Sequence, residues 1–441
     1  MYAIILTGAL AILLLFAIWF SKGDILSPAV LFSASFLFSA IWMLPFMGQW
    51  QLKLSEKTFW CISVGVFVFD IVCVFVAFSK WKFTSNNTFT KELKYIDIDL
   101  WKKIVFFFIE LFTVVYSFYI KLKFAGGSFA TVFVTMASYR ANIMFYGGKT
   151  VVLPGWLNLL NSAVTAAGYW FAYVVANNYI LKKSIDKMAL AIFSISFINT
   201  ILSTSRGGTL TYLIAFIVYF MILSRISHGS QKRVKFKIVF IAAIILFVFV
   251  VSFQAVGNLL SRGSTETTAD YLVRYCGAEI PNLDDWLSHQ RRDNNSILGS
   301  QTFIYVIQWF GDKLGLLDVK YDLDLPFRIV AGKNLGNVYT TFYPFIYDFG
   351  YKGLVLLSAI MAMISQGVYR KIKNTGLDYR PSRYILLYGF IAPTLLLSFF
   401  SNKFYESIFN SAFMYTFLFW IIFDYIFCDK AKKKFRIRRH L

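Results

Sequence analysis

Long apolar stretches separated by shorter polar connectors dominate the chain. Eleven of these stretches approach the roughly 20 residues that a helix needs to cross the hydrocarbon core of a membrane. The pattern therefore predicts an all-α polytopic integral membrane protein with about eleven transmembrane helices. The apolar run at 2–20 has no basic segment before it, so we expect a permanent span rather than a cleavable signal. The predicted spans are 2–20, 27–47, 58–79, 103–120, 155–180, 188–204, 209–224, 238–255, 353–369, 384–400 and 405–427.

One connector, residues 256–352, is far longer than the others and rich in polar and charged side chains. Within it, 277–287 is predicted to start a helix with acidic first turns, and 301–317 fits an interfacial or re-entrant helix. The chain thus divides into four predicted parts: 1–255 with about eight N-terminal spans, the large loop 256–352 with short interfacial helices, 353–427 with about three C-terminal spans, and the basic tail 428–441.

Composition supports a membrane location. Apolar residues make up 58% of the 441 positions, and aromatic residues make up 20%. A soluble domain of this size could not cover that much apolar surface, so lipid must solvate part of it. The four cysteines show no paired or metal-binding spacing, and no nucleotide-binding signature is present. We therefore predict neither a metal site nor a nucleotide cofactor.

The net charge of +21 is concentrated in the connectors. If the C-terminal tail is placed in the cytoplasm and the spans alternate, 27 of the 44 lysines and arginines fall in cytoplasmic connectors, most of them short. The positive-inside rule then predicts that the N-terminus and the 256–352 loop are extracytoplasmic. The basic connectors are explained by topology and contact with anionic lipid, so we expect no nucleic-acid partner.

Two polar segments on the predicted outer face carry an arginine. Arg206 lies in the turn 203–208, between hydroxyl residues and glycines, just ahead of a span. A helix N-terminus offers free N–H groups, and an arginine fork matches phosphate oxygens, so this turn has the chemistry of an anion site. Arg140 lies in the outer segment 121–154, where we expect an interfacial helix. In both cases the alternative is an arginine that reaches lipid headgroups.

Three segments resemble a known family. The turn 204–208 is similar to the arginine–glycine turn of Wzy-type oligosaccharide repeat-unit polymerases, and the stretches 336–353 and 275–287 are similar to segments of the same family. The resemblance implies a GT-C-like fold in a bacterial cytoplasmic (inner) membrane. It also implies that undecaprenyl-pyrophosphate-linked oligosaccharide repeats are polymerised at the outer face into a cell-surface polysaccharide.

The implied reaction gives each candidate residue a role. A leaving pyrophosphate needs cationic stabilisation, for which the candidates are Arg206, Arg140, Arg274 and Arg328. The acceptor hydroxyl needs a base, for which the candidates are Asp348 and Glu279, with His289 in reserve. Two aromatic side chains could stack on sugar faces or anchor the loop at the membrane interface, namely Tyr339 and Tyr343. The expected partners are the lipid-linked oligosaccharide, membrane lipids, and chain-length regulator and flippase proteins.

Other function classes remain open. Asp70 and Glu110 lie near the middle of predicted spans, where a charge is costly, so each should be protonated, paired or exposed to water. They favour a transporter such as a lipid-linked oligosaccharide flippase or a proton-coupled carrier, unless each bonds only to a neighbouring helix. A lipid-linked glycan ligase, in which His289 would matter more, and a scaffold in an export complex are further alternatives.

Overall fold

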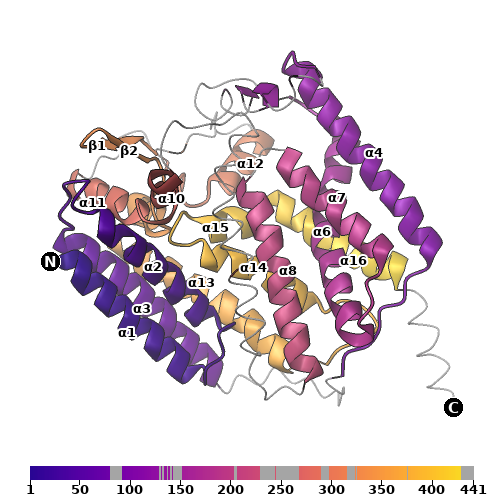
Figure 1. Cartoon of the computed structure of the whole chain (residues 1–441), viewed down its shortest axis with the longest axis horizontal. Helices are drawn as coiled ribbons and strands as arrows, with labels where there is room; N and C mark the ends of the chain where they lie inside the picture. The colour runs from indigo at the N-terminus through magenta and orange to yellow at the C-terminus, as the bar shows by residue number, and fades with distance from the viewer. Residues whose placement is uncertain are drawn as a thin grey trace. The chain divides into compact units, whose positions relative to one another are not determined.

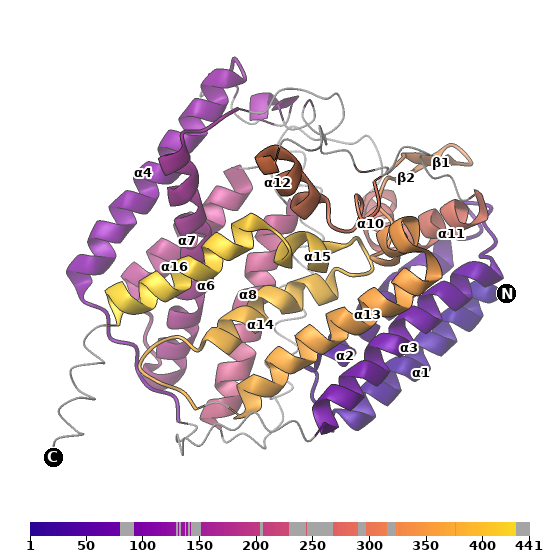
Figure 2. The same cartoon turned by 180° about the vertical axis from the view of Figure 1, so that it is seen from behind.

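The protein is described by a computed structural model that divides into two compact units. Unit 1 comprises residues 1–85, 266–374 and 391–413, and unit 2 comprises 86–265, 375–390 and 414–441. The structure describes residues 1–79, 92–128, 151–202, 206–228, 268–289, 297–314, 325–374 and 376–428, with positions 131, 134–136, 138, 139, 142, 244 and 323. Each unit is a bundle of helices (Figure 1 and Figure 2).

Unit 1 is built on four long helices, α1 (Tyr2–Phe20), α2 (Pro28–Met43), α3 (Glu56–Phe78) and α13 (Phe342–Asn374). A short 3₁₀ turn, Leu44–Phe46, extends α2. Helices α1, α2 and α3 lie side by side, and α13 packs along α3 (Figure 2). The described parts of the long loop add α10 (Thr268–Cys276), α11 (Glu279–His289), α12 (Ile304–Leu314) and two short strands. The unit also contains α15 (Lys403–Ile408) and the end of α14 (Arg383–Leu396).

Unit 2 is built on α4 (Leu100–Phe124), α6 (Gly155–Lys182), α7 (Lys187–Leu202) and α8 (Arg206–Ser227). It also contains the start of α14 and most of α16 (Ser411–Phe427). The α6 helix packs against both α7 and α8, and α4 packs against α7. Its interior is aromatic: Trp170, Tyr173, Tyr219 and Trp420 are almost completely buried. Large ring surfaces therefore supply much of the packing in this unit.

Seven described helices are long and apolar enough to cross a membrane, as expected of a multi-pass membrane protein. Three further predicted spans correspond to shorter apolar helices, α7, α14 and α16. The predicted span 238–255 lies outside the described residues, apart from Ile244. The predicted span 405–427 is divided between α15 and α16.

A small hairpin corrects the all-α prediction. Strand β1 (Arg328–Val330) pairs antiparallel with β2 (Lys333–Gly336) through a two-residue turn. Both turn residues have positive φ, 48° at Ala331 and 74° at Gly332. This is the geometry that joins twisted antiparallel strands through a tight turn. The sequence signal is weak because alanine is an unusual residue for the first turn position.

Helix α13 begins earlier than the predicted span at 353–369. Its first residues, Phe342–Tyr347, are buried, and the Thr340 hydroxyl accepts the Phe342 N–H at 3.3 Å. The helix is broken at Gly350, whose φ of 65° and ψ of −163° are open to glycine and to almost no other residue. The end of the predicted loop is therefore a short buried helix that precedes the long span.

In unit 1, connectors predicted to share the cytoplasmic side meet at one end of the bundle. The Asp24 carboxylate, between α1 and α2, lies 2.8 Å from Lys373 Nζ and accepts the Tyr369 hydroxyl at 2.8 Å. Arg370 donates to the Val76 carbonyl and the Ser79 hydroxyl at the end of α3. These contacts join the ends of α3 and α13 to the α1–α2 turn. The grouping agrees with the predicted alternation of the spans between the two membrane faces.

The same grouping occurs within unit 2. Lys103, at the start of α4, lies 2.7 Å from Asp186 in the α6–α7 turn. The Asn178 amide donates to the Ile96 carbonyl, and Lys94 lies over the Tyr379 ring at 4.8 Å. Apart from Asn178, which lies near the end of α6, these residues belong to three connectors that the charge pattern assigns to the cytoplasm. The alternation of spans is therefore consistent within each unit.

Candidate functional site

Helices α10 and α11 are attached to the end of α2 through a glycine. A Cβ atom at Gly277 would lie 2.8 Å from the Met43 nitrogen and 2.9 Å from the Trp42 carbonyl carbon. Only glycine permits this approach, because both neighbouring atoms belong to a backbone that cannot move aside. The close approach places Glu279, the first residue of α11, beside α2.

Glu279 is a fully buried carboxyl group at this junction. Its side chain is completely covered, and its Oε2 lies 3.5 Å from the Ser39 hydroxyl of α2. Its Oε1 is also buried and has no hydrogen-bond partner within the described part of the chain. Burial raises the pKa of Glu279 well above its usual range, and its own backbone N–H and the Ser39 hydroxyl oppose this shift only in part. A buried carboxyl with a raised pKa is a candidate for proton transfer.

The raised pKa of Glu279 predicts how the stability of the fold depends on pH. A carboxyl whose pKa is raised by folding contributes stability that is complete below its ordinary pKa, declines above it, and is lost once the pH passes the folded-state pKa. Thermal unfolding, followed by tryptophan fluorescence, is therefore expected at progressively lower temperature as the pH rises from the ordinary pKa of a glutamate toward the raised pKa of buried Glu279. Glu279→Gln should show a shallower decline, and equal slopes for the two proteins would contradict the assignment.

Asp284 joins α11 to the start of α3. Its Oδ1 accepts the Ser55 N–H at 2.9 Å, the Ser55 hydroxyl at 2.5 Å and the Thr58 hydroxyl at 2.6 Å. Ser55 is the N-cap of α3, so a carboxylate sits at the positive end of a helix. The sequence analysis did not single out Asp284. Its acidic neighbours and its place in the first turns of α11 were the available signals, but neither identifies α3 as the partner.

Asp284→Ala is expected to destabilise the fold by about 1–3 kcal/mol, because three donors lose their acceptor. The measurement is the unfolding midpoint in denaturant, and Asp378→Ala is the control. Asp378 is exposed and lies 3.6 Å from an equally exposed Arg380, a type of pair that contributes little. An Asp284 variant as stable as the Asp378 variant would contradict this role.

The Arg328 guanidinium bonds to residues of α11. Its Nη1 donates to the Pro281 carbonyl, and its Nη2 lies 3.1 Å from the Asp285 carboxylate. Burial lowers the pKa of Arg328, while Asp285 opposes that shift, and arginine retains its charge in any case. The structure therefore places this predicted pyrophosphate ligand in an ion pair that fixes the hairpin to α11.

Arg274 packs beside the hairpin. It lies in the last turn of α10, and its aliphatic carbons would meet a Cβ at Gly336 at 3.5 Å. The Asn282 amide, one turn beyond Glu279, donates to the Leu335 and Val338 carbonyls at 3.1 and 2.9 Å. The structure thus gathers Glu279, Arg274 and Arg328 around α10, α11 and the hairpin. Asn282 is a residue that the sequence analysis missed, although its position three residues after Glu279 places both on one helix face.

Asp348 has a different environment from the one predicted. It is almost fully buried, and its two oxygens accept the Gln301 N–H at 3.3 Å and the Thr302 N–H at 2.6 Å. The Thr302 hydroxyl in turn donates to the Pro344 carbonyl of α13. Asp348 therefore anchors the turn before α12 onto α13. This arrangement explains the carboxylate structurally, and its predicted role as a base stays a prediction.

The predicted sugar-stacking tyrosines are core residues. Tyr339 and Tyr343 are 4% and 1% exposed, and their ring centroids lie 4.7 Å apart. Tyr343 packs edge-on against Trp286, with centroids 4.8 Å apart. The Tyr339 hydroxyl donates to the Pro326 carbonyl. Their ring faces are covered by one another and by α11, so in this structure they are not available for stacking on a sugar.

His289 is exposed at the end of α11. Its Nδ1 lies 2.8 Å from the Asp285 carbonyl and 3.3 Å from the Asp285 carboxylate. A ring held by its own helix in this way resembles an ordinary surface histidine. Its reserve role as a base stays a prediction.

The two remaining arginine candidates belong to unit 2. Arg206 is the first residue of α8, so the predicted placement at a helix start is confirmed. Its side chain and the hydroxyl residues 203–205 lie outside the described part of the structure, as does Arg140.

Comparison of the chain with protein-family models, curated proteins and solved structures finds no match.

Proposed function

We propose that the chain is a membrane glycosyltransferase that polymerises undecaprenyl-pyrophosphate-linked oligosaccharide repeat units at the outer face of a bacterial cytoplasmic membrane. One observation carries the proposal. At the end of unit 1 opposite the Asp24–Lys373 connectors, the buried carboxyl of Glu279 lies on the same group of elements as Arg274 and Arg328. A membrane-embedded bundle with a proton acceptor and guanidinium groups at one end suits transfer from a phosphorylated lipid.

The proposed reaction exchanges one glycosidic bond for another. The bond between the growing glycan and the lipid pyrophosphate breaks, and the anomeric carbon bonds to a hydroxyl oxygen of the next lipid-linked repeat. The hydroxyl proton passes to Glu279, and the lipid pyrophosphate leaves with the electron pair. Glu279 is fully buried at the junction with α2, so the proposed reaction requires the acceptor hydroxyl to gain access to this junction during turnover.

The direct test is an elongation assay. Purified protein in lipid nanodiscs would receive a lipid-pyrophosphate-linked repeat unit without nucleotide sugar. A ladder of products that differ by one repeat supports polymerisation. No product beyond one repeat, from protein with a normal unfolding transition, would contradict it and would favour ligation or transport.

Arg206→Ala is expected to remove long glycans from cells, because an arginine fork and the first N–H groups of α8 would stabilise the leaving pyrophosphate. Loss of one such interaction typically lowers a rate about 100–1,000-fold. The measurement is the glycan length distribution on a gel at matched protein level. Arg225→Ala, at the other end of the same helix, is the control. A normal length distribution in the Arg206 variant would refute the assignment.

A proton-coupled carrier of lipid-linked oligosaccharide is the second candidate. It is favoured by two carboxyl groups buried in spans. Asp70 accepts the Ser33 hydroxyl at 2.8 Å, and Glu110 accepts the Ser196 hydroxyl at 2.5 Å. The other oxygen of each has no partner within the described residues. If Asp70→Asn and Glu110→Gln abolish pH-gradient-driven movement of the substrate across liposomes, and the wild type makes no ladder, the carrier is the better description.

A further inference from the structure

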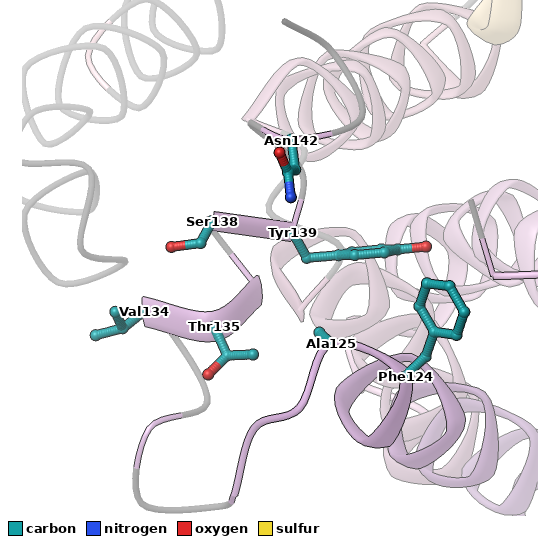
Figure 3. Close-up of a pocket in the computed structure, with 7 residues that line it drawn as sticks. All are labelled: Phe124, Ala125, Val134, Thr135, Ser138, Tyr139 and Asn142. Carbon is teal, nitrogen blue, oxygen red and sulfur yellow. The ribbon is translucent and has the colours of Figure 1, made fainter. Parts of the chain in front are cut away.

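A pocket at the end of α4 in unit 2 is distinct from the Glu279 junction in unit 1. It has a volume of about 410 Å³, within the roughly 300–1,000 Å³ typical of small-molecule sites. Phe124, the last residue of α4, and Ala125, its C-cap, line one side of the pocket. A following segment supplies the remaining lining residues (Figure 3), which are Val134, Thr135, Ser138, Tyr139 and Asn142.

Contacts among the described residues fix the wall of this pocket. Gly126, at φ 72°, ends α4, and the Gly127 N–H donates to the Leu122 carbonyl at 3.0 Å. The Thr135 side chain occupies the space beside Gly127, where an added Cβ would lie 2.6 Å from it. The segment is therefore seated on the glycine turn that terminates α4.

A hydrogen bond and a ring contact position the aromatic side of the pocket. The Tyr139 hydroxyl accepts the Val151 N–H at 2.8 Å, and the Tyr139 and Phe124 rings meet edge-to-face with centroids 6.0 Å apart. Figure 3 shows the Asn142 amide pointing toward Tyr139. Two aromatic rings thus adjoin the amide of Asn142 and the hydroxyls of Thr135 and Ser138.

The lining chemistry selects the class of ligand. The seven described residues that line the pocket are all uncharged, so none of them supplies a counter-charge for a pyrophosphate. Hydroxyl and amide groups can donate and accept hydrogen bonds, and aromatic rings offer flat apolar surface with one polar tip at Tyr139. A neutral polyhydroxylated ring matches both properties.

We propose that this pocket binds a neutral sugar residue of the lipid-linked oligosaccharide. The proposal rests on the proposed function, and it assigns glycan recognition to the end of α4 rather than to the buried Tyr339 and Tyr343. The pyrophosphate would then be bound elsewhere, so glycan recognition and leaving-group stabilisation would be separable by mutation.

The test uses the full-length protein in nanodiscs and the glycan released by mild acid from extracted lipid-linked oligosaccharide. Saturation-transfer NMR measures its binding to the wild type and to the Ser138→Ala/Asn142→Ala double variant. Both positions are exposed, so the fold should survive. We expect at least a tenfold weaker affinity and a tenfold higher KM for elongation, with kcat unchanged. Val152→Ala, an 88% exposed position after the same segment, is the control.

The outcomes separate this inference from the proposed function. Binding of the free glycan that the double variant loses, without any ladder from the wild type, would support the pocket and reject the polymerase. A ladder from the wild type with equal affinity and KM in the double variant would reject the pocket alone. Displacement of the bound glycan by isoprenoid pyrophosphate lacking sugar would also overturn the assignment. Absence of both binding and ladder rejects both.

Discussion

Glu279→Gln is expected to lower the rate of glycan elongation by at least about 100-fold while leaving the protein folded. The amide has nearly the shape of the carboxyl group and can still accept the Ser39 hydroxyl, so the junction between α2 and α11 should be retained. It cannot take a proton from the acceptor. The assay is single-turnover elongation with a lipid-linked repeat, performed at a fixed amount of folded protein.

The pH profile strengthens this test. Burial raises the pKa of Glu279, so the ionised form that acts as a base becomes more populated as the pH rises through that value. The wild-type rate should therefore increase over the pH range in which stability declines. The variant should lose that pH dependence. Glu56→Gln is the control, because this carboxylate accepts hydrogen bonds from Tyr2 and Trp60 at an exposed site. Normal elongation by Glu279→Gln would exclude it as the proton acceptor.

Gly277→Ala is expected to displace α10 and α11 from α2 and to reduce both stability and elongation. A methyl group would lie 2.8 Å from one backbone atom and 2.9 Å from another, and neither can rotate away. Overpacking of this kind typically costs about 1–3 kcal/mol. Gly367→Ala is the matched control, because a Cβ there meets nothing within 4 Å and alanine favours the helical conformation of α13.

The neighbouring cysteine gives a local readout. Cys276 is buried beside Gly277, while Cys73 is buried within α3. Maleimide labelling located by mass spectrometry should show faster modification of Cys276 in the Gly277 variant, with Cys73 still protected. If Cys276 is as well protected in the Gly277 variant as in the wild type, the close approach of Gly277 to α2 is dispensable. Uniform exposure of both cysteines would indicate global unfolding instead of local displacement.

Much of the helical framework follows from the sequence because it depends on local properties. Apolar runs long enough to span a membrane become helices, since lipid offers no partner for free backbone groups. The charge pattern also groups connectors correctly within each unit, as the Asp24–Lys373 and Lys103–Asp186 pairs show. The position of Arg206 at the start of α8 was predicted for the same reason, because helix starts have local signals.

The roles of loop residues depended on contacts that no local pattern encodes. By sequence, Asp348 and Tyr343 belong to an extracytoplasmic loop, yet both are buried residues in the first turns of α13. The early start of α13, broken at Gly350, brings them into the core. A loop of this length can fold back on the bundle, and its pairing partners are then set by packing rather than by sequence distance.

The sequence by itself predicted the long apolar helices, the grouping of their connectors within each unit and the set of candidate arginines and carboxylates. Only the tertiary structure distinguished among those candidates. It placed Glu279 against Ser39, 240 residues away in the chain, and directed Asp348 to backbone N–H groups and Arg328 to Asp285. The physical reason is that burial and hydrogen-bond partners determine the pKa of a carboxyl group, and so whether it can accept a proton. Both are set by the way distant segments pack.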